Sequence, residues 1–301
     1  MRILVTGGAG FIGSHIVDML VEQGYRVLVV DNLSTGKLDN LNPGVEFINL
    51  DICSIELIKV VADFQPNAVI HQAAQVSVPV SIEQPADDAR INVMGTVNIL
   101  EACRLVEVKK IIYASSAAVY GEPEYLPVDE KHPIKPMCGY GLSKHTGERY
   151  LKLFHDLYGL KFSVLRYANV YGPRQDALGE GGVVSKFVER LQQGFPPVIY
   201  GNGQQTRDFV YVKDVASANI AALFSGDNQV LNVSTNEPTS VNKLVNLLKD
   251  IAGFSGEAEY MQPRAGDIVH SYLSNKKIKE QLNWRPRWTL ELGLKETYKK
   301  R

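Results

Sequence analysis

Apolar residues in the first half of the chain fall into short runs separated by amphipathic segments. Short apolar runs are typical of buried strands, and they lie at 2–6, 26–30, 45–48, 68–70 and 110–114. Segments with helical spacing of apolar positions lie between them, at 11–23, 55–64 and 87–106. Gly24 follows the first of these segments, as is common at a helix end. The alternation predicts an α/β fold: a doubly wound parallel sheet with helices on both faces.

The pattern changes in the second half. A long helix is predicted at 138–158 and a strand at 162–167, and after about residue 171 glycine and proline become frequent and strands shorten. Short helices are expected near 183–193, 241–252 and 290–300. We therefore interpret 1–170 as a large α/β domain and 171–301 as a smaller, mixed α/β lobe. A helix near 214–225 and a strand near 230–233 are expected to return to the large sheet, so that about 210–235 belongs with it.

Composition excludes several classes of protein. The 301 residues carry a net charge of −1, without the basic footprint of a nucleic-acid binder. No run reaches the ~18 apolar residues of a membrane span. The N-terminus enters a strand at once, so we expect no export sequence. Cys53, Cys103 and Cys138 are odd in number and widely spaced, which favours reduced thiols in a cytoplasmic protein over a disulfide or a metal site.

A glycine-rich turn joins the first strand to the first helix. Gly7, Gly10 and Gly13 have the spacing G-x-x-G-x-x-G, and Phe11 and Ile12 begin the helix within it. Glycines allow a tight turn and a close approach of pyrophosphate, and the helix N-terminus offers free N–H groups. An ordinary glycine turn is the alternative. The strand before, the helix after and an acid further on favour a dinucleotide-binding Rossmann fold.

That acid is Asp31, which follows Gly13 by 18 residues and ends the second strand. A carboxylate there binds the ribose diol and would repel a 2′-phosphate, so NAD is favoured over NADP. Asn32 and Ser34 follow it and are expected to line the same pocket. Asp51 and Ile52, after the third strand, could meet the adenine edge, although an Asp after a strand is often only a helix cap.

Tyr140 and Lys144 stand four residues apart on the predicted long helix and therefore share one face. A free Tyr, with a pKa near 10, is a poor base at neutral pH. A nearby ammonium group and the positive nicotinamide ring favour its phenolate, which could then take a proton from a hydroxyl while hydride leaves the same carbon. The spacing alone is a common accident. Downstream of a dinucleotide site, it favours catalysis.

Ser115 and Ser116 end the strand at 110–114 and lead into a turn. The carboxyl ends of parallel strands face the ligand crevice, so a hydroxyl there can bond the substrate oxygen and Tyr140. A serine that only shapes the turn is the alternative.

Together these motifs resemble the extended short-chain dehydrogenase/reductase superfamily, and most closely its UDP-glucose 4-epimerase family. The resemblance covers almost the whole chain. Besides the glycine turn, Ser115–Gly121 and the Tyr140–Lys144 helix, it rests on the stretches at 71–74, 92–96, 166–173, 207–214, 264–267 and 282–286.

The resemblance implies roles residue by residue. Ser116, Tyr140 and Lys144 match the catalytic group, and Ala73, Ala74 and Asn92 match positions lining the cofactor pocket. The family binds a nucleotide diphosphate in the second lobe. The matching positions there are Asn169 with the helix start Gly182, Val183 and Val184 for the diphosphate, and Tyr200, Arg207, Arg264 and Asp267 for the remaining substrate contacts. Paired Arg side chains and a helix N-terminus suit two phosphates.

The resemblance also implies the reaction. Related dehydratases and decarboxylases carry acidic residues directly after the catalytic Ser/Thr, where this chain has Ala117 and Ala118. NADPH-dependent sugar reductases are disfavoured by Asp31. The expected activity is NAD-dependent 4-epimerisation of a UDP-hexose. Alternatives are another nucleotide-sugar 4-epimerase, such as one for a uronic acid, an NAD(H)-dependent reductase, and a non-catalytic NAD-sensing regulator, which the retained catalytic group disfavours.

Two finer expectations follow from the same resemblance. Ser271 aligns with a position that is either a bulky Tyr or a small residue, and the small version leaves room for an N-acetyl sugar. Relatives pair as homodimers through the Tyr140 helix and the helix before it. Phe154, Leu157 and Tyr158 are candidate contacts in such a dimer, although they could equally belong to the core.

Overall fold

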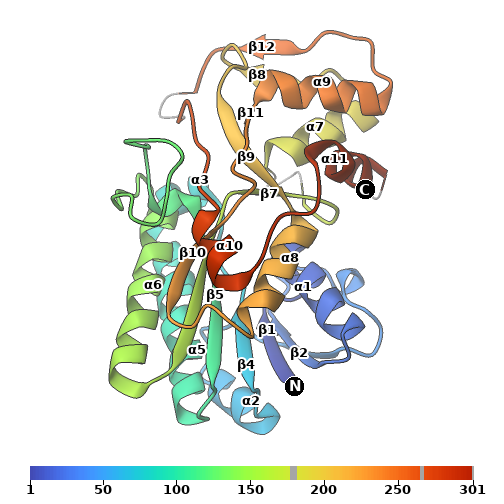
Figure 1. Ribbon diagram of the computed structural model, residues 1–301. Coiled ribbons are helices and arrows are strands. Elements are labelled where there is room, and N and C mark those ends of the chain that lie inside the picture. The colour runs from blue at the N-terminus through green and yellow to red at the C-terminus, as the bar shows by residue number, and fades with distance from the viewer. Residues whose placement is uncertain (177–181, 265–267, 300–301) are drawn as a thin grey trace.

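Seven parallel strands form one sheet at the centre of the molecule (Figure 1). The computed structural model describes residues 1–176, 182–264 and 268–299. In sheet order the strands are β10 (Gln229–Val233), β6 (Lys161–Tyr167), β5 (Lys110–Ser116), β4 (Ala68–His71), β1 (Arg2–Thr6), β2 (Arg26–Asp31) and β3 (Glu46–Asn49). The predicted parallel α/β fold is confirmed.

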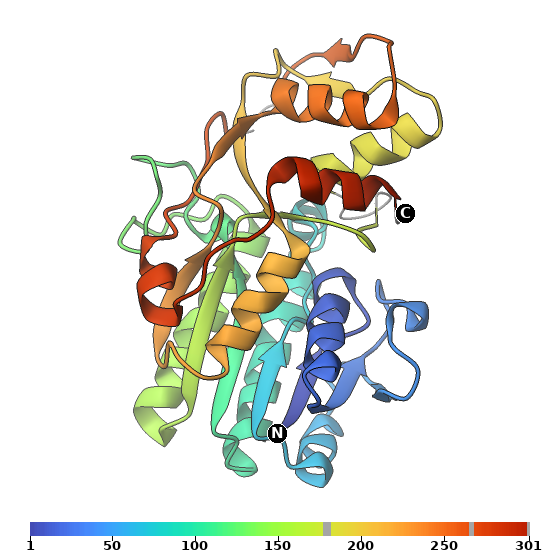
Figure 2. The same ribbon diagram turned by 45° about the vertical axis from the view of Figure 1, so that its right-hand side comes forward.

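Both faces of this sheet are covered, because alternate strand residues point to opposite sides. Ile3 and Val5 enter one core and Leu4 enters the other. The first core is closed by α1 (Phe11–Glu22) and α8 (Val212–Ala222), which lie side by side in Figures 1 and 2. The second is closed by α2 (Leu57–Phe64), α5 (Gly95–Leu105) and α6 (Gly139–Tyr158). Burial on both faces explains why these strands are uninterrupted apolar runs.

The strand order reverses between β1 and β4. From β1 the chain first builds outward through β2 and β3, and then returns to place β4 on the other side of β1. Ligands of such sheets bind at this switch point, outside the carboxyl ends of the strands. Thr6 and His71 pair here, with Thr6 Oγ1 2.6 Å from His71 Nδ1.

One predicted helix is not continuous. The segment expected at 87–106 consists of α4 (Pro85–Ala89), a π-helical turn η2 (Arg90–Met94) and α5. The sequence prediction also lacked α3 (Val78–Glu83), which is capped by the Ser77 side chain. Two 3₁₀ turns are η1 (Leu38–Asn40) and η3 (Ala117–Val119).

A smaller lobe lies above the carboxyl edge of the large sheet in Figure 1. It contains a three-stranded sheet, β11 (Pro238–Ser240), β9 (Thr206–Tyr211) and β7 (Asn169–Tyr171), and the pair β12 (Glu259–Met261) and β8 (Val198–Tyr200). Its helices are α7 (Val183–Gln192), α9 (Val241–Ala252) and α11 (Leu290–Lys299), while α10 (Lys276–Leu282) packs near β10. Between β9 and β11 the chain passes back through α8 and β10, on the large sheet.

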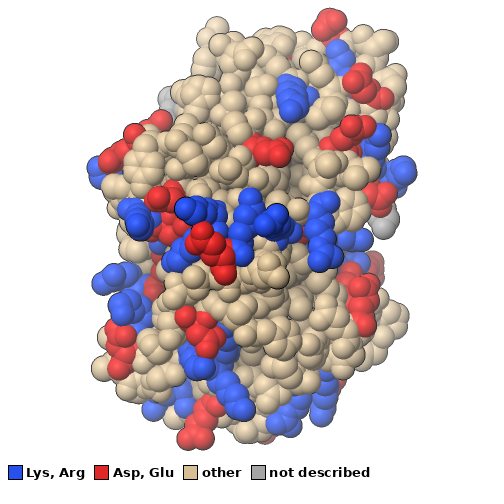
Figure 3. Space-filling view, in the orientation of Figure 1, with Lys and Arg blue, Asp and Glu red and all other residues tan. Residues whose placement is uncertain are grey.

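The surface carries both signs of charge. Figure 3 shows a row of basic side chains crossing the middle of one face, with acidic groups above, below and among them. Among the described residues, no helix is both long and apolar enough to span a membrane.

Candidate functional site

The glycine turn between β1 and α1 is shaped for close approach. Gly7 has a φ of +67°, and a Cβ there would lie 2.6 Å from the main-chain nitrogen of Ala73. A Cβ on Gly13 would lie 2.1 Å from the Gly7 oxygen. Gly10 begins α1 without any side-chain cap, so the first N–H groups of the helix are offered to a ligand. Phe11 and Ile12 form this first turn.

Asp31 ends β2 beside the glycine turn. Its Oδ2 accepts the Ala9 N–H at 3.0 Å and its Oδ1 accepts the Leu33 N–H at 2.8 Å. The carboxylate is buried, and burial raises its pKa although both N–H groups oppose the shift. Asp31 therefore holds the turn in place, and each oxygen keeps lone-pair capacity for a ribose hydroxyl. The sequence prediction missed Asn40, whose side chain donates to the main-chain oxygen of Ala9 at 2.8 Å.

Asp51, Asn32 and Ser34, which were predicted near the adenosine, make hydrogen bonds that hold two turns. Asp51 Oδ1 accepts the Cys53 N–H at 2.8 Å, and Asn32 donates to Asp51 Oδ2 at 3.4 Å. Asn32 also caps Ser34, accepting its N–H at 3.1 Å. Ile52 is buried in the core. Asp51 therefore caps the turn at Cys53 and not a helix, since α2 begins at Leu57 after Glu56 without a side-chain cap.

Asn92 lies in the π-helical turn and is 2% exposed. Its oxygen accepts the Gln75 N–H at 2.8 Å, and its nitrogen donates to the Gln75 oxygen, Asp88 Oδ1 and Ser143 Oγ. Asn92 thus fixes the loop that follows Ala73 and Ala74, and also joins that loop to α6. A buried side chain with this many partners explains the break in the predicted helix, because the turn must rotate Asn92 inward.

The three predicted catalytic residues come from β5 and α6. Ser116 ends β5, and its Oγ accepts the Ala118 N–H at 3.2 Å. Tyr140 lies in the first turn of α6, whose Gly141 approaches so closely that a Cβ would lie 2.5 Å from the Ala118 oxygen. The start of α6 is thereby held against the turn that follows Ser116. Burial raises the pKa of Tyr113 and of Tyr167, and the proximity of Tyr140 adds to both increases.

Lys144 is 3% exposed and sits one turn further along α6. Its Nζ donates to the main-chain oxygen of Ala114 at 2.9 Å and stands 5.2 Å from the ring centroid of Tyr113. Burial lowers the pKa of Lys144 to about 8. The group remains mostly an ammonium ion at neutral pH, so it favours an adjacent phenolate.

Residues predicted to hold a nucleotide make two sets of contacts in the smaller lobe. The Arg264 guanidinium lies 3.8 Å from the ring centroid of Tyr200 and lowers the pKa of that phenol. Arg207 donates to the main-chain oxygens of Thr206 and Val269, at 2.8 and 3.4 Å. Ser271 donates its N–H to the Thr206 oxygen at 3.1 Å, which places it beside the same strand.

The predicted diphosphate contacts lie at β7 and at the start of α7. Asn169 is exposed at the start of β7. Gly182 begins α7 without a side-chain cap, followed by half-buried Val183. The Val184 side chain is buried in the core, so only its main chain can face a ligand. Asp267 lies outside the described residues.

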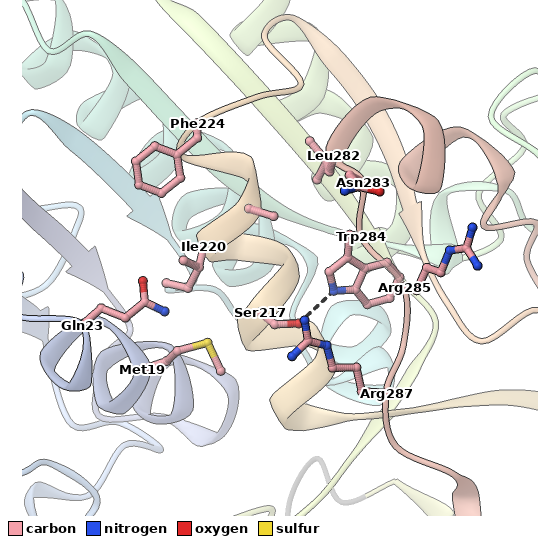
Figure 4. Close-up of a pocket in the computed structure, with 11 residues that line it drawn as sticks. Met19, Gln23, Ser217, Ile220, Phe224, Leu282, Asn283, Trp284, Arg285 and Arg287 are labelled. Atoms are coloured by element: carbon pink, nitrogen blue, oxygen red, sulfur yellow. Dashed lines mark hydrogen bonds between the residues drawn. The ribbon is translucent and has the colours of Figure 1, made fainter.

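A concavity of about 460 Å³ lies away from these residues, between α1, α8 and the segment after α10 (Figure 4). Met19, Ile220, Leu282 and Trp284 line it, and the Trp284 indole donates to Ser217 Oγ at 2.8 Å. It contains none of the predicted site residues. Groups of three or more His, Cys, Asp or Glu side chains suited to a metal ion are absent from the described part of the chain.

Comparison with known proteins adds the chemistry. The model of the NAD-dependent epimerase/dehydratase family matches residues 3–234. A Methanocaldococcus jannaschii protein, provisionally named UDP-glucose 4-epimerase, is 52% identical over 97% of this chain and 96% of its own. The structure of Thermotoga maritima UDP-glucose 4-epimerase with UDP-glucose is 48% identical, with a TM-score of 0.97, and covers 99% and 98% of the two chains.

A second similar structure has a larger sugar nucleotide. It is UDP-N-acetylglucosamine 4-epimerase from Methanobrevibacter ruminantium in complex with UDP-N-acetylmuramic acid. The two sequences are 39% identical, the TM-score is 0.95, and the match covers 99% of this chain and 97% of the other.

Proposed function

Because the chain belongs to the NAD-dependent epimerase/dehydratase family, we propose that it catalyses the reversible 4-epimerisation of a UDP-hexose, with UDP-galactose and UDP-glucose as the first pair. The observation that carries the proposal is the close contact between the start of α6, which carries Tyr140, and the turn η3 that follows Ser116, with Lys144 one helical turn further along α6. This arrangement provides for proton transfer at one sugar hydroxyl, and it lacks the additional acidic side chain that elimination or decarboxylation would use.

The residues around the glycine turn fit NAD. The close contacts of Gly7 and Gly13 hold the tight turn that presents the uncapped start of α1 to a pyrophosphate, and Asp31 is an acceptor for the ribose. NAD, when bound, supplies the hydride acceptor and donor. The residues that we propose to hold it are Gly7, Gly10, Phe11, Ile12, Gly13, Asp31, Asn32, Ser34, Asp51, Ile52, Ala73, Ala74, Asn92, Tyr140 and Lys144.

The proton moves through Tyr140. As a phenolate, it takes the proton of the sugar's C4 hydroxyl while the C4 hydrogen departs as hydride, and a 4-keto sugar is left. Ser116 Oγ accepts a main-chain N–H from Ala118, so its own proton is available to the sugar oxygen. The Lys144 ammonium holds Tyr140 in its basic form.

Inversion requires the keto sugar to present its other face while the nucleotide stays bound. We assign the nucleotide grip to the smaller lobe, through Asn169, the α7 start, Tyr200, Arg207 and Arg264. Return of hydride and proton to the opposite face of C4 gives the epimer. No side-chain acid or base stands at Ala117 or Ala118 for elimination or decarboxylation.

The test is purified protein with UDP-galactose, followed by NMR without added reductant. The expected result is UDP-glucose at an equilibrium ratio, and Tyr140→Phe is expected to lower the rate by about 10²–10⁴-fold. Stoichiometric consumption of NADH would replace the epimerase with a reductase. Unchanged turnover in Tyr140→Phe would remove the assigned base.

Substrate width depends on Ser271, beside Thr206. We propose that this small residue admits UDP-GlcNAc and UDP-GalNAc, and the similar N-acetylglucosamine epimerase supports this. Ser271→Tyr is expected to abolish N-acetyl sugar turnover while keeping UDP-galactose turnover within a few-fold. A wild type inactive on N-acetyl sugars would refute the proposal.

Assembly is proposed to be a homodimer through α5 and α6. Leu157 and Tyr158 are 61% and 53% exposed on α6, whereas Phe154 is buried in the core and is not available as a contact. We expect a dimer by sedimentation and a monomer for Leu157→Lys.

We also propose a cytoplasmic location, since the three cysteines are free thiols.

A further inference from the structure

Glu148 stands one turn beyond Lys144 on α6. Residues spaced by four share a helix face, so Tyr140, Lys144 and Glu148 form one row. Glu148 is only 5% exposed. Burial of a carboxylate costs free energy unless its oxygens accept hydrogen bonds, so partners for Glu148 are expected nearby.

Both oxygens of Glu148 bond to the ends of β5 and β6. Oε1 accepts Ser115 Oγ at 2.6 Å and Arg166 Nε at 2.9 Å, and Oε2 accepts Arg166 Nη2 at 2.6 Å. Ser115 and Arg166 are register partners on adjacent strands, and Ser115 directly precedes Ser116. The carboxylate therefore ties the helix that carries Tyr140 to the strand that carries Ser116.

The charge of Glu148 also acts on Lys144. Burial would raise the pKa of Glu148, but its hydrogen bonds with Arg166, His145 and Ser115 outweigh this and hold it well below the ordinary value. Burial lowers the pKa of Lys144 to about 8, and the negative charges of Asp88 and Glu148 oppose that decrease.

The remaining groups near Lys144 are neutral at physiological pH. His71 on β4 has its pKa lowered to about 3 by burial, and burial raises the pKa of Tyr113 on β5. Tyr167 on β6 is held neutral by burial in the same way, with a pKa of about 12. The charges that act on Lys144 are therefore those of Asp88 from α4 and Glu148 from α6, while Arg166 from β6 and His145 from α6 contact Glu148.

Building on the proposed epimerase chemistry, we infer that Glu148 is a positioning residue for proton transfer. Its carboxylate fixes α6 against the ends of β5 and β6, and its negative charge balances Arg166 so that Lys144 keeps its proton beside the Tyr140 phenolate.

The size of the effect follows from distance. At 1.5 Å per residue, Glu148 lies about 6 Å along the helix from Lys144 and about twice that from Tyr140. Loss of its charge therefore disfavours the ammonium more than it favours the phenolate. With an effective dielectric constant of about 20, the phenolate–ammonium pair becomes about tenfold less populated relative to the pair in which both side chains are neutral. Loss of the Arg166 charge acts in the opposite direction.

The experiment is a pH titration of the Lys144 ammonium in NAD-bound protein, read by NMR as the side-chain signal that is absent from the matching Lys144→Met protein. In Glu148→Gln, the midpoint is expected to fall by about one to two pH units and kcat at pH values above it to fall by up to about tenfold, with KM unchanged and the loss recovered at lower pH. Arg166→Gln is expected to raise the midpoint. The double variant should return it to the wild-type value.

Asp156→Asn is the matched control, because Asp156 is an exposed carboxylate on the same helix. A folded Glu148→Gln protein with the wild-type midpoint overturns the inference, as does an equal loss of kcat at every pH. If one single variant fails to fold, the direction of the shift in the other decides. The titration needs no sugar, so a failure of the proposed epimerase activity would appear separately, as a wild type without turnover.

Discussion

Asp31 does two things with one carboxylate. Each oxygen accepts a main-chain N–H, from Ala9 and Leu33, and the same group faces the proposed ribose site. In Asp31→Asn, the amide NH₂ must face one of these donors whichever way it is turned. Loss of a charge-assisted hydrogen bond costs about 1.5–3 kcal/mol, so we expect about 10–100-fold weaker NAD binding by calorimetry. Asp39→Asn, an exposed change in the following turn, should bind NAD like the wild type. Equal affinity for both variants would contradict the assignment.

Helix α6 delivers its side chains by close contact at its first turn. A Cβ on Gly141 would lie 2.5 Å from the Ala118 oxygen, so Gly141→Ala must push the helix start away from the turn after Ser116. A misplacement of about 1 Å can cost about 10²-fold, and we expect kcat to fall by that order. NAD affinity should not change, because the glycine turn lies on a different strand. Arg149→Ala, exposed on the same helix, is the control. A Gly141→Ala protein with full activity would show that the contact is not needed.

At the same scale, local spacing determined what the sequence could predict. The β1–α1 glycine turn and the Tyr140–Lys144 pair depend on periods within one element, and both are found where expected. Glu148 and Arg166 were not singled out, because their pairing depends on the register of β5 and β6 and on how α6 packs there. An isolated charge at either position is indistinguishable from a surface residue. The π-helical turn was missed because Asn92 bonds there to residues from distant segments, such as Ser143, and local spacing does not show such contacts.

At the scale of the whole molecule, one buried carboxylate links the two sheets. Asp208 lies on β9, in the smaller sheet. Its Oδ1 accepts the N–H and hydroxyl of Thr235, just after β10 of the large sheet, and its Oδ2 accepts N–H groups of Asn236 and Leu273. Arg207 precedes it and Ser271 lies close to Leu273 in the chain. The Asp208 side chain therefore contributes to the relative placement of the nucleotide-binding residues and the cofactor turn.

Asp208→Asn keeps the shape of that side chain but turns one acceptor into a donor among four donors. A buried donor left without a partner costs about 1–3 kcal/mol, so the midpoint of chemical unfolding should fall accordingly. We also expect KM for the UDP-sugar to rise several-fold. NAD affinity should not change, because the NAD residues lie at the glycine turn of the large sheet. Asp250→Asn, an exposed change on α9, should alter neither quantity. Equal losses of NAD and sugar affinity would mean that Asp208 supports the fold in general, and the link between the sheets would have to lie elsewhere.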